Sequence, residues 1–399
     1  MKRMMLSILF LLVLSLSCCS LAEKEKLYIT QTGAASMQEK QYIEENPDID
    51  ITIRRVDDCT PGWVAQQIES GDNITDLYVV RTNYAGYYDL ISRGYCAELN
   101  SIEQLSSILQ KMPQYVLDAI SCNGTIFAVP EMIILNSDNC VLCNTKHPLW
   151  QQYDLKNHHS VKDILDMIDD LQNKNELDQW WLWDDHCDDA HLYNISIVGC
   201  ISYMEANDHM DMSNPEYVNL FYQQDKARQR LIERSTPPEN EALFHSLSFV
   251  DSSLLTNEDY ELIIFTPFPG QTEMFQLSMQ VIVLNPYAPN KEDAIAYLMH
   301  RIENYPQLES LFLFPDTTES QVTISDEITE VNPALTQDVI TKVRSSADVI
   351  RIPTKGYLTL FWDEPGLSAE SRYFSGYMSI EQYIEYLTKK LRMIESESK

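Results

Sequence analysis

The chain is poor in glycine, in basic residues and in long apolar runs. Only 11 of its 399 residues are glycine, and no low-complexity stretch or internal repeat stands out. With 44% hydrophobic residues, this composition indicates folded domains with large cores and argues against disorder. Beyond the N-terminus no run approaches the roughly 18 apolar residues that a membrane-spanning helix needs. The length favours two or three domains.

Acidic residues outnumber basic ones by 60 to 29, which gives a formal net charge of −31. A surface this acidic repels phosphate backbones and anionic lipid heads. The charge therefore excludes nucleic acid as a partner.

Catalytic signatures are also missing. The sequence contains no GxSxG, HExxH, Walker or dinucleotide-binding fingerprint, and these motifs mark common hydrolase and cofactor sites. We therefore expect no enzyme activity and no cofactor. Paired carboxylates could still form a glycosidase site, so a secreted hydrolase acting on polysaccharide stays open as an alternative.

The N-terminus has the layout of a secretory signal. Lys2 and Arg3 precede the apolar stretch 4–16, and small residues follow. This order predicts a signal peptide over residues 1–22 and an extracytoplasmic location. Two processing routes are open. Cleavage after Ala22 would release the protein, whereas lipid attachment at Cys18 or Cys19 would anchor a lipoprotein to the outer face of the cell membrane, and the second route is favoured.

Cysteine and acidic clusters raise the question of a metal site. Cys140 and Cys143 have the spacing of half a zinc site, but the sequence offers no second pair of ligands to complete it. Residues three apart on a strand point to opposite faces, so we expect buried thiols. The segment 184–191 (DDHCDDAH) carries ligand types for divalent ions, yet consecutive acids usually form a solvated loop or a helix start. No metal site is predicted.

Strand and helix signals alternate along the first 130 residues, which predicts a parallel or mixed α/β sheet. A second unit is expected to begin near Ile133. Its clearest helices follow the caps Ser160 and Ser379, the second with Gln382 in a capping box. The strands expected are 27–31, 49–56, 77–80, 126–130, 140–144, 260–265 and 280–284, and the helices 37–45, 61–69, 84–92, 192–205 and 216–232.

Six segments resemble a known family in the order in which its members carry them. They are NPDIDI at 46–51, IESGDNITDLYVV at 68–80, YDLISRGYCAEL at 88–99, DAISCNGTIFAVP at 118–130, and the helices over 286–302 and 373–394. The chain resembles the extracellular solute-binding proteins of ABC importers, in family 1, the maltose-binding-protein-like group. Thr75 stands where the family usually has proline, and residues 138–256 match only in outline.

The resemblance implies an α/β, two-lobe periplasmic-binding-protein-like fold of type II, with the ligand cleft between the lobes. The expected first lobe is 27–131 plus about 274–324, and the second is 132–273 plus about 325–399. The implied function is a monomeric receptor that delivers a small polar solute, a carbohydrate, to the permease subunits of an ABC transporter. An orphan lipoprotein with the cleft used as a protein-docking surface is a further alternative.

Candidate ligand-binding residues follow the ends of predicted strands. Arg81, Thr82 and Tyr84 come directly after the strand 77–80, and ligands of α/β proteins usually bind at the carboxyl ends of strands. Phe268 holds the equivalent place in the second lobe, after the strand 260–265.

A cluster of tryptophans adds a second group of candidates. Trp181 and Trp183 are followed at once by Asp184. A flat ring can stack on a sugar while a carboxylate takes its hydroxyls, and aromatic residues are enriched at binding surfaces as well as in cores. These three residues are predicted to contact the solute, with packing of the second lobe as the alternative.

Overall fold

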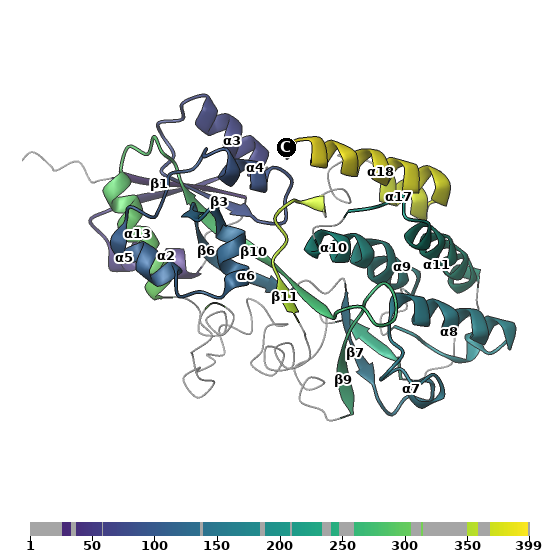
Figure 1. The fold of residues 1–399 in the computed structure, drawn as a ribbon. Coiled ribbons are helices and arrows are strands. Elements are labelled where there is room, and N and C mark those ends of the chain that lie inside the picture. The colour runs from purple at the N-terminus through teal and green to yellow at the C-terminus, as the bar shows by residue number, and fades with distance from the viewer. Residues whose placement is uncertain are drawn as a thin grey trace, which may run out of the picture.

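The computed structural model describes residues 26–32, 37–57, 59–135, 139–183, 188–207, 210–233, 241–246, 259–304, 313, 349–357 and 368–397. These residues form a mixed α/β structure with two lobes that lie side by side (Figure 1). The predicted signal peptide, with Cys18 and Cys19, lies outside the described residues, as does Asp184. Within the described ranges, no helix has the length and apolar character to cross a bilayer.

The first lobe is built on a six-stranded sheet in the order β11-β10-β3-β1-β2, with β6 also paired to β10. Its strands are β1 Lys26–Gln31, β2 Asp50–Arg55, β3 Leu77–Arg81, β6 Ala128–Leu135, β10 Met274–Leu284 and β11 Val349–Arg351. β1 pairs in parallel with β2 and β3, whereas β10 runs antiparallel to both β3 and β6. The sheet is therefore mixed, as the alternating pattern predicted.

Helices cover this sheet on both sides (Figure 1). α3 Pro61–Glu69 and α4 Tyr87–Ser92 lie on one side, and α2 Met37–Glu45, α5 Glu103–Leu109, α6 Gln114–Ile120 and α13 Lys291–Glu303 lie on the other. α3 begins where Thr60 caps it, because the threonine hydroxyl accepts the Trp63 N–H. A short hairpin, β4 Ser121–Cys122 and β5 Thr125–Ile126, precedes β6.

The second lobe is built on a three-stranded antiparallel sheet in the order β8-β7-β9. Its strands are β7 Cys140–Asn144, β8 Phe244–Ser246 and β9 Tyr260–Ile264. Its helical segments are α7 Pro148–Gln152, α8 Val161–Asn173, η1 Leu177–Gln179, α9 Asp188–Tyr193, η2 Asn194–Val198, α10 Gly199–Ala206, α11 Pro215–Glu233, α17 Ala369–Phe374 and α18 Ile380–Glu397. Ser160 and Asp163 form a capping box at α8, and Ser379 and Gln382 form the predicted one at α18.

Two hydrophobic core clusters, one for each lobe, meet at β7. Cys140 and Leu142 belong to the first cluster, whereas Val141 and Cys143 belong to the second. This division follows from the period of two along a strand. The expected opposite orientation of Cys140 and Cys143 is therefore confirmed. Both thiols are buried, as are those of Cys59, Cys96 and Cys200.

The chain passes between the two clusters at three places among the described residues. Ile133 lies in the first cluster and Cys143 in the second, while Phe265 lies in the second and Phe275 in the first. The third passage runs from Ile352 in the first cluster to Tyr357 in the second. In Figure 1 the long strand β10 and the segment after β11 cross the space between the lobes.

Some element boundaries differ from the sequence predictions. The strand expected at 280–284 extends back to Met274, because residues 274–279 also pair with β6 and β11 and are buried throughout. The helix expected over 84–92 begins only at Tyr87, since Gly86 takes a left-handed conformation with φ of 84°. The helix expected over 192–205 is three segments, with the π-helical turn η2 between α9 and α10.

Candidate functional site

The segment Arg81–Tyr84 lies where β3 ends, beside the crossing strand β10. Arg81 is in register with Gln280, and the Thr82 N–H donates to the Met279 carbonyl at 2.9 Å. Arg81 and Tyr84 are both half-buried, and the guanidinium carbon of Arg81 lies 5.7 Å from the centroid of the Tyr84 ring. A cation over an aromatic face holds both side chains in place.

Buried polar groups without partners gather on the elements around this segment. Thr82 and Ser202 are fully buried and Asn83 is 3% exposed, yet the Thr82 Oγ1, Ser202 Oγ and Asn83 Oδ1 atoms have no hydrogen-bond partner in the described part of the chain. The same holds for both amide atoms of Gln276, which is also fully buried. An unsatisfied buried polar group costs about 1–3 kcal/mol of stability. We therefore expect these atoms to hydrogen-bond water or a polar ligand.

Gln276 and Ser202 come from elements that pack together. Gln276 lies on β10 and Ser202 on α10, and α10 packs against β10. α10 thus brings a second-lobe hydroxyl close to the strand that crosses into the first lobe. Sequence reasoning missed both residues. The signal for Gln276 was present, because Gln276, Ser278 and Gln280 alternate with apolar residues along β10 and so share one face.

The third crossing segment contacts both lobes. Glu205, near the end of α10 and only 5% exposed, accepts the N–H groups of Lys355 at 3.0 Å and Gly356 at 3.2 Å. Burial raises the pKa of the Glu205 carboxyl to about 7, although these backbone donors act in the opposite direction. On the other side, Gly356 lies directly against the backbone of Tyr84 and Ala85.

The tryptophan cluster divides between surface and core. Trp181 is half-buried, whereas Trp183 is fully buried in the second core cluster. The Trp183 ring stacks on His191 with 6.0 Å between centroids and tilts against Phe244 at 5.2 Å. In this structure the Trp183 ring presents no surface, which favours the alternative of core packing, and its contact with the solute stays a prediction. Trp181 keeps an exposed portion.

Phe268 lies in a turn of the second lobe. Its N–H donates to the Gln271 side chain at 3.0 Å, and its carbonyl accepts the Thr266 hydroxyl at 3.0 Å. The half-buried ring packs edge-on against Tyr217, with 5.2 Å between centroids. The structure thus places Arg81, Thr82 and Tyr84 at the lobe junction and Phe268 at the edge of the second core.

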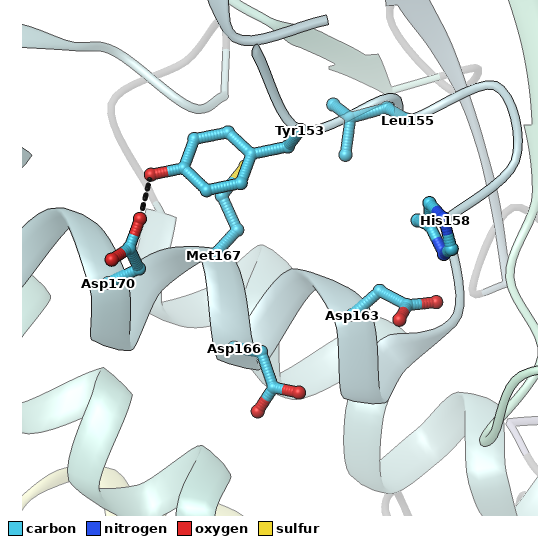
Figure 2. A pocket seen from close by; sticks show the side chains of 7 residues that line it. All are labelled: Tyr153, Leu155, His158, Asp163, Asp166, Met167 and Asp170. Atoms are coloured by element: carbon cyan, nitrogen blue, oxygen red, sulfur yellow. Dashed lines mark hydrogen bonds between the residues drawn. The ribbon is translucent and has the colours of Figure 1, made fainter.

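A separate hollow of about 270 Å³ lies on the second lobe between α8 and the segment that follows α7 (Figure 2). It is lined by Tyr153, Leu155, His158, Asp163, Asp166, Met167 and Asp170. Figure 2 shows the Tyr153 hydroxyl pointing at Asp170, to which it donates at 2.7 Å. Asp166 pairs with Lys162 and Asp170 with Lys174. Asp166 and Asp170 are thus paired with lysines, Asp163 belongs to the capping box of α8, and the hollow lies apart from the lobe junction.

Comparison with known proteins gives a match at the level of structure. No family model matches the sequence, and no curated protein matches it. Among solved structures, an ABC substrate-binding protein from Listeria monocytogenes in complex with cycloalternan is similar, with a TM-score of 0.56 and 11% identity over 94% of this chain and 100% of that one.

Two further structures are similar to the same degree. A sugar transporter from Bacillus licheniformis in complex with stachyose has a TM-score of 0.54 at 12% identity, over 92% of this chain and 98% of that one. A probable secreted solute-binding lipoprotein from Streptomyces coelicolor has a TM-score of 0.54 at 12% identity, over 93% of this chain and 99% of that one. The predicted fold class is therefore confirmed: this chain has the two-lobe α/β fold of the maltose-binding-protein-like solute-binding proteins.

Proposed function

We propose that this protein is an extracytoplasmic receptor that captures a small polar solute, a carbohydrate, between its lobes and delivers it to the permease subunits of an ABC importer. One observation carries the proposal: the segment after β3, the crossing strand β10 and the helix α10, which pack at the lobe junction, carry buried hydroxyl and amide groups that have no hydrogen-bond partner among the described residues. The similar structures from Listeria monocytogenes and Bacillus licheniformis hold cycloalternan and stachyose, and both ligands are oligosaccharides.

The chemistry of the junction suits a sugar. Gln276 offers two donors and an acceptor, and Thr82 and Ser202 each offer a hydroxyl that can donate or accept. Sugar hydroxyls both donate and accept hydrogen bonds, so they need partners of both kinds. We propose that the half-buried rings of Tyr84 and Trp181 take the apolar face of a pyranose. Arg81 would fix the orientation of a ring oxygen or hydroxyl through its planar donors.

The lobes would close on the solute as rigid bodies. We propose a first lobe of residues 27–131 plus about 274–324, to whose sheet β11 adds a strand, and a second lobe of 132–273 plus the rest of about 325–399. Crossing segments at β6, β10 and residues 352–357 join the two lobes. Two packed cores joined by a few extended strands are the usual arrangement for hinge closure. Closure excludes water, so a few aimed polar groups then supply the specificity.

Export and anchoring complete the proposal. Residues 1–22 would direct the chain across the membrane, and Cys18 or Cys19 would carry a lipid, which the likeness to a secreted solute-binding lipoprotein supports. The receptor would then act as a monomer at the outer face of the membrane. Mass spectrometry of the native N-terminus tests the anchor: a diacylglyceryl cysteine supports it, and an unmodified Glu23 supports free secretion instead.

A ligand screen tests the function. Maltose, stachyose, cyclic and linear oligosaccharides, and peptides are added to the purified protein, and thermal unfolding is recorded. A solute at 100 times its Kd stabilises the protein by about 2.7 kcal/mol. The same incubation is assayed for released reducing ends. Turnover would favour the polysaccharide hydrolase, and stabilisation by no sugar would overturn the proposal.

Two matched variants then locate the solute. Gln276→Leu removes the buried amide at the lobe junction, and we expect at least tenfold weaker binding with little change in stability. Gln224→Leu removes another fully buried amide, which lies in α11 and also has an atom without a described partner. It should leave affinity unchanged. Wild-type affinity in Gln276→Leu would place the solute elsewhere.

A further inference from the structure

Three of the eleven glycines take part in two close backbone contacts, one within the first lobe and one between the lobes. A Cβ added to Gly86 would lie 3.1 Å from the backbone nitrogen of Gly62, at the start of α3. A Cβ added to Gly356 would lie 2.2 Å from the backbone nitrogen of Ala85 and 2.4 Å from the carbonyl carbon of Tyr84. We call these two close backbone contacts together the glycine seam.

The glycine seam joins the two lobes directly. Gly356 precedes Tyr357, which packs in the second core, while the turn at Tyr84 and Ala85 leads into α4 of the first lobe. Figure 1 shows the segment after β11 rising between the lobes, with α4 on one side and α10 on the other. Because main chain meets main chain, no side chain can adjust to relieve a change at this place.

Glu205 holds the second-lobe side of the seam. Its carboxylate accepts the N–H groups of Lys355 and Gly356 at 3.0 and 3.2 Å, and a charged acceptor makes stronger hydrogen bonds than a neutral one. The turn is thereby tied to α10, the helix that also carries Ser202. Gly356 has φ of 75°, a left-handed conformation that side chains other than glycine rarely adopt.

We propose that Glu205 and Gly356 are positioning residues that set the separation of the lobes at the solute site. The inference rests on the proposed function, because Tyr84 on the seam is adjacent to Thr82 and Asn83 at the junction. A side chain at 356 needs ordinary contact distance from Ala85 in place of 2.2 Å, so the turn and the first lobe must move apart. The polar groups on the two sides then no longer reach the same solute.

The test compares Gly356→Ala with Gly376→Ala. Gly376 has φ of 74°, nearly the same as Gly356, but a Cβ there meets nothing within 4 Å. The control therefore carries the same backbone strain without the contact. Small-angle X-ray scattering of the solute-free proteins measures the radius of gyration, and calorimetry measures solute affinity.

We expect Gly356→Ala to have a larger radius of gyration than wild type and at least tenfold weaker solute binding, while Gly376→Ala matches wild type in both. Equal radii in the two variants would overturn the inference. The scattering needs no solute, so an enlarged Gly356→Ala in a protein that binds no sugar would refute the proposed function and leave the seam intact.

A second pair of variants covers the case in which Gly356→Ala fails to fold. Glu205→Gln keeps a side-chain carbonyl that can accept from the turn, whereas Glu205→Leu keeps the size and removes every acceptor. Glu205→Leu should enlarge the radius of gyration and Glu205→Gln should do so less. Identical scattering in wild type and Glu205→Leu would show that Glu205 does not set the lobe separation.

Discussion

Replacing Trp183 separates a core role from a ligand role for the tryptophan cluster. Trp183 is 0% exposed and packs on Phe244 and His191, and truncating such a side chain to alanine costs about 3–5 kcal/mol. Trp181 is only half-buried, so the same change there removes less packing, about 1–2 kcal/mol. Trp183→Ala should therefore unfold at a clearly lower denaturant concentration than Trp181→Ala.

Trp183→Phe provides an internal control. The Trp183 Nε1 has no hydrogen-bond partner in the described ranges, so phenylalanine loses volume but no identified hydrogen bond. We expect Trp183→Phe to fall between wild type and Trp183→Ala. The assay is urea unfolding followed by circular dichroism, with the slope checked for a change in the exposed surface. If Trp183→Ala kept wild-type stability and lost solute binding, the ring would face the solute and the reasoning from burial would be refuted.

Further predictions concern pH and helix capping. Burial raises the pKa of Glu131 to about 7, with Arg301, at 3.2 Å, lowering it and Glu39 raising it. The folded state then binds more protons than the unfolded one between about pH 4.5 and 7, so this group's contribution to stability falls as pH rises through that window, by on the order of 3 kcal/mol. Between pH 5 and pH 8, the free energy of unfolding should vary by about 3 kcal/mol less in Glu131→Gln than in the wild type. If the two proteins varied equally, the raised pKa of Glu131 would be contradicted. Ser160→Ala removes the capping box of α8 and should lower the free energy of unfolding by about 1 kcal/mol, with Ser160→Asp as the variant that restores an acceptor.

Local patterns in the sequence determined most of the elements and the fold class. The helices α2 and α3 and the strand β7 have the predicted boundaries, because apolar periodicity, caps and breakers act within a few residues. The capping residues Ser379 and Gln382 likewise hydrogen-bond as predicted. The alternation of these elements predicted an α/β sheet, and the resemblance to the solute-binding proteins implied the two-lobe fold, which the solved structures share.

Tertiary structure decided which side chains lie at the lobe junction. Gln276 and Ser202 are about 70 positions apart, and only the packing of α10 on the crossing strand β10 brings their elements together. Trp181 and Trp183 look alike in sequence, but only the packing of Phe244 and His191 places Trp183 in the core. The contact of Gly356 with Ala85 joins segments about 270 positions apart. Burial and long-range contact depend on how whole lobes pack, and no local pattern carries that information.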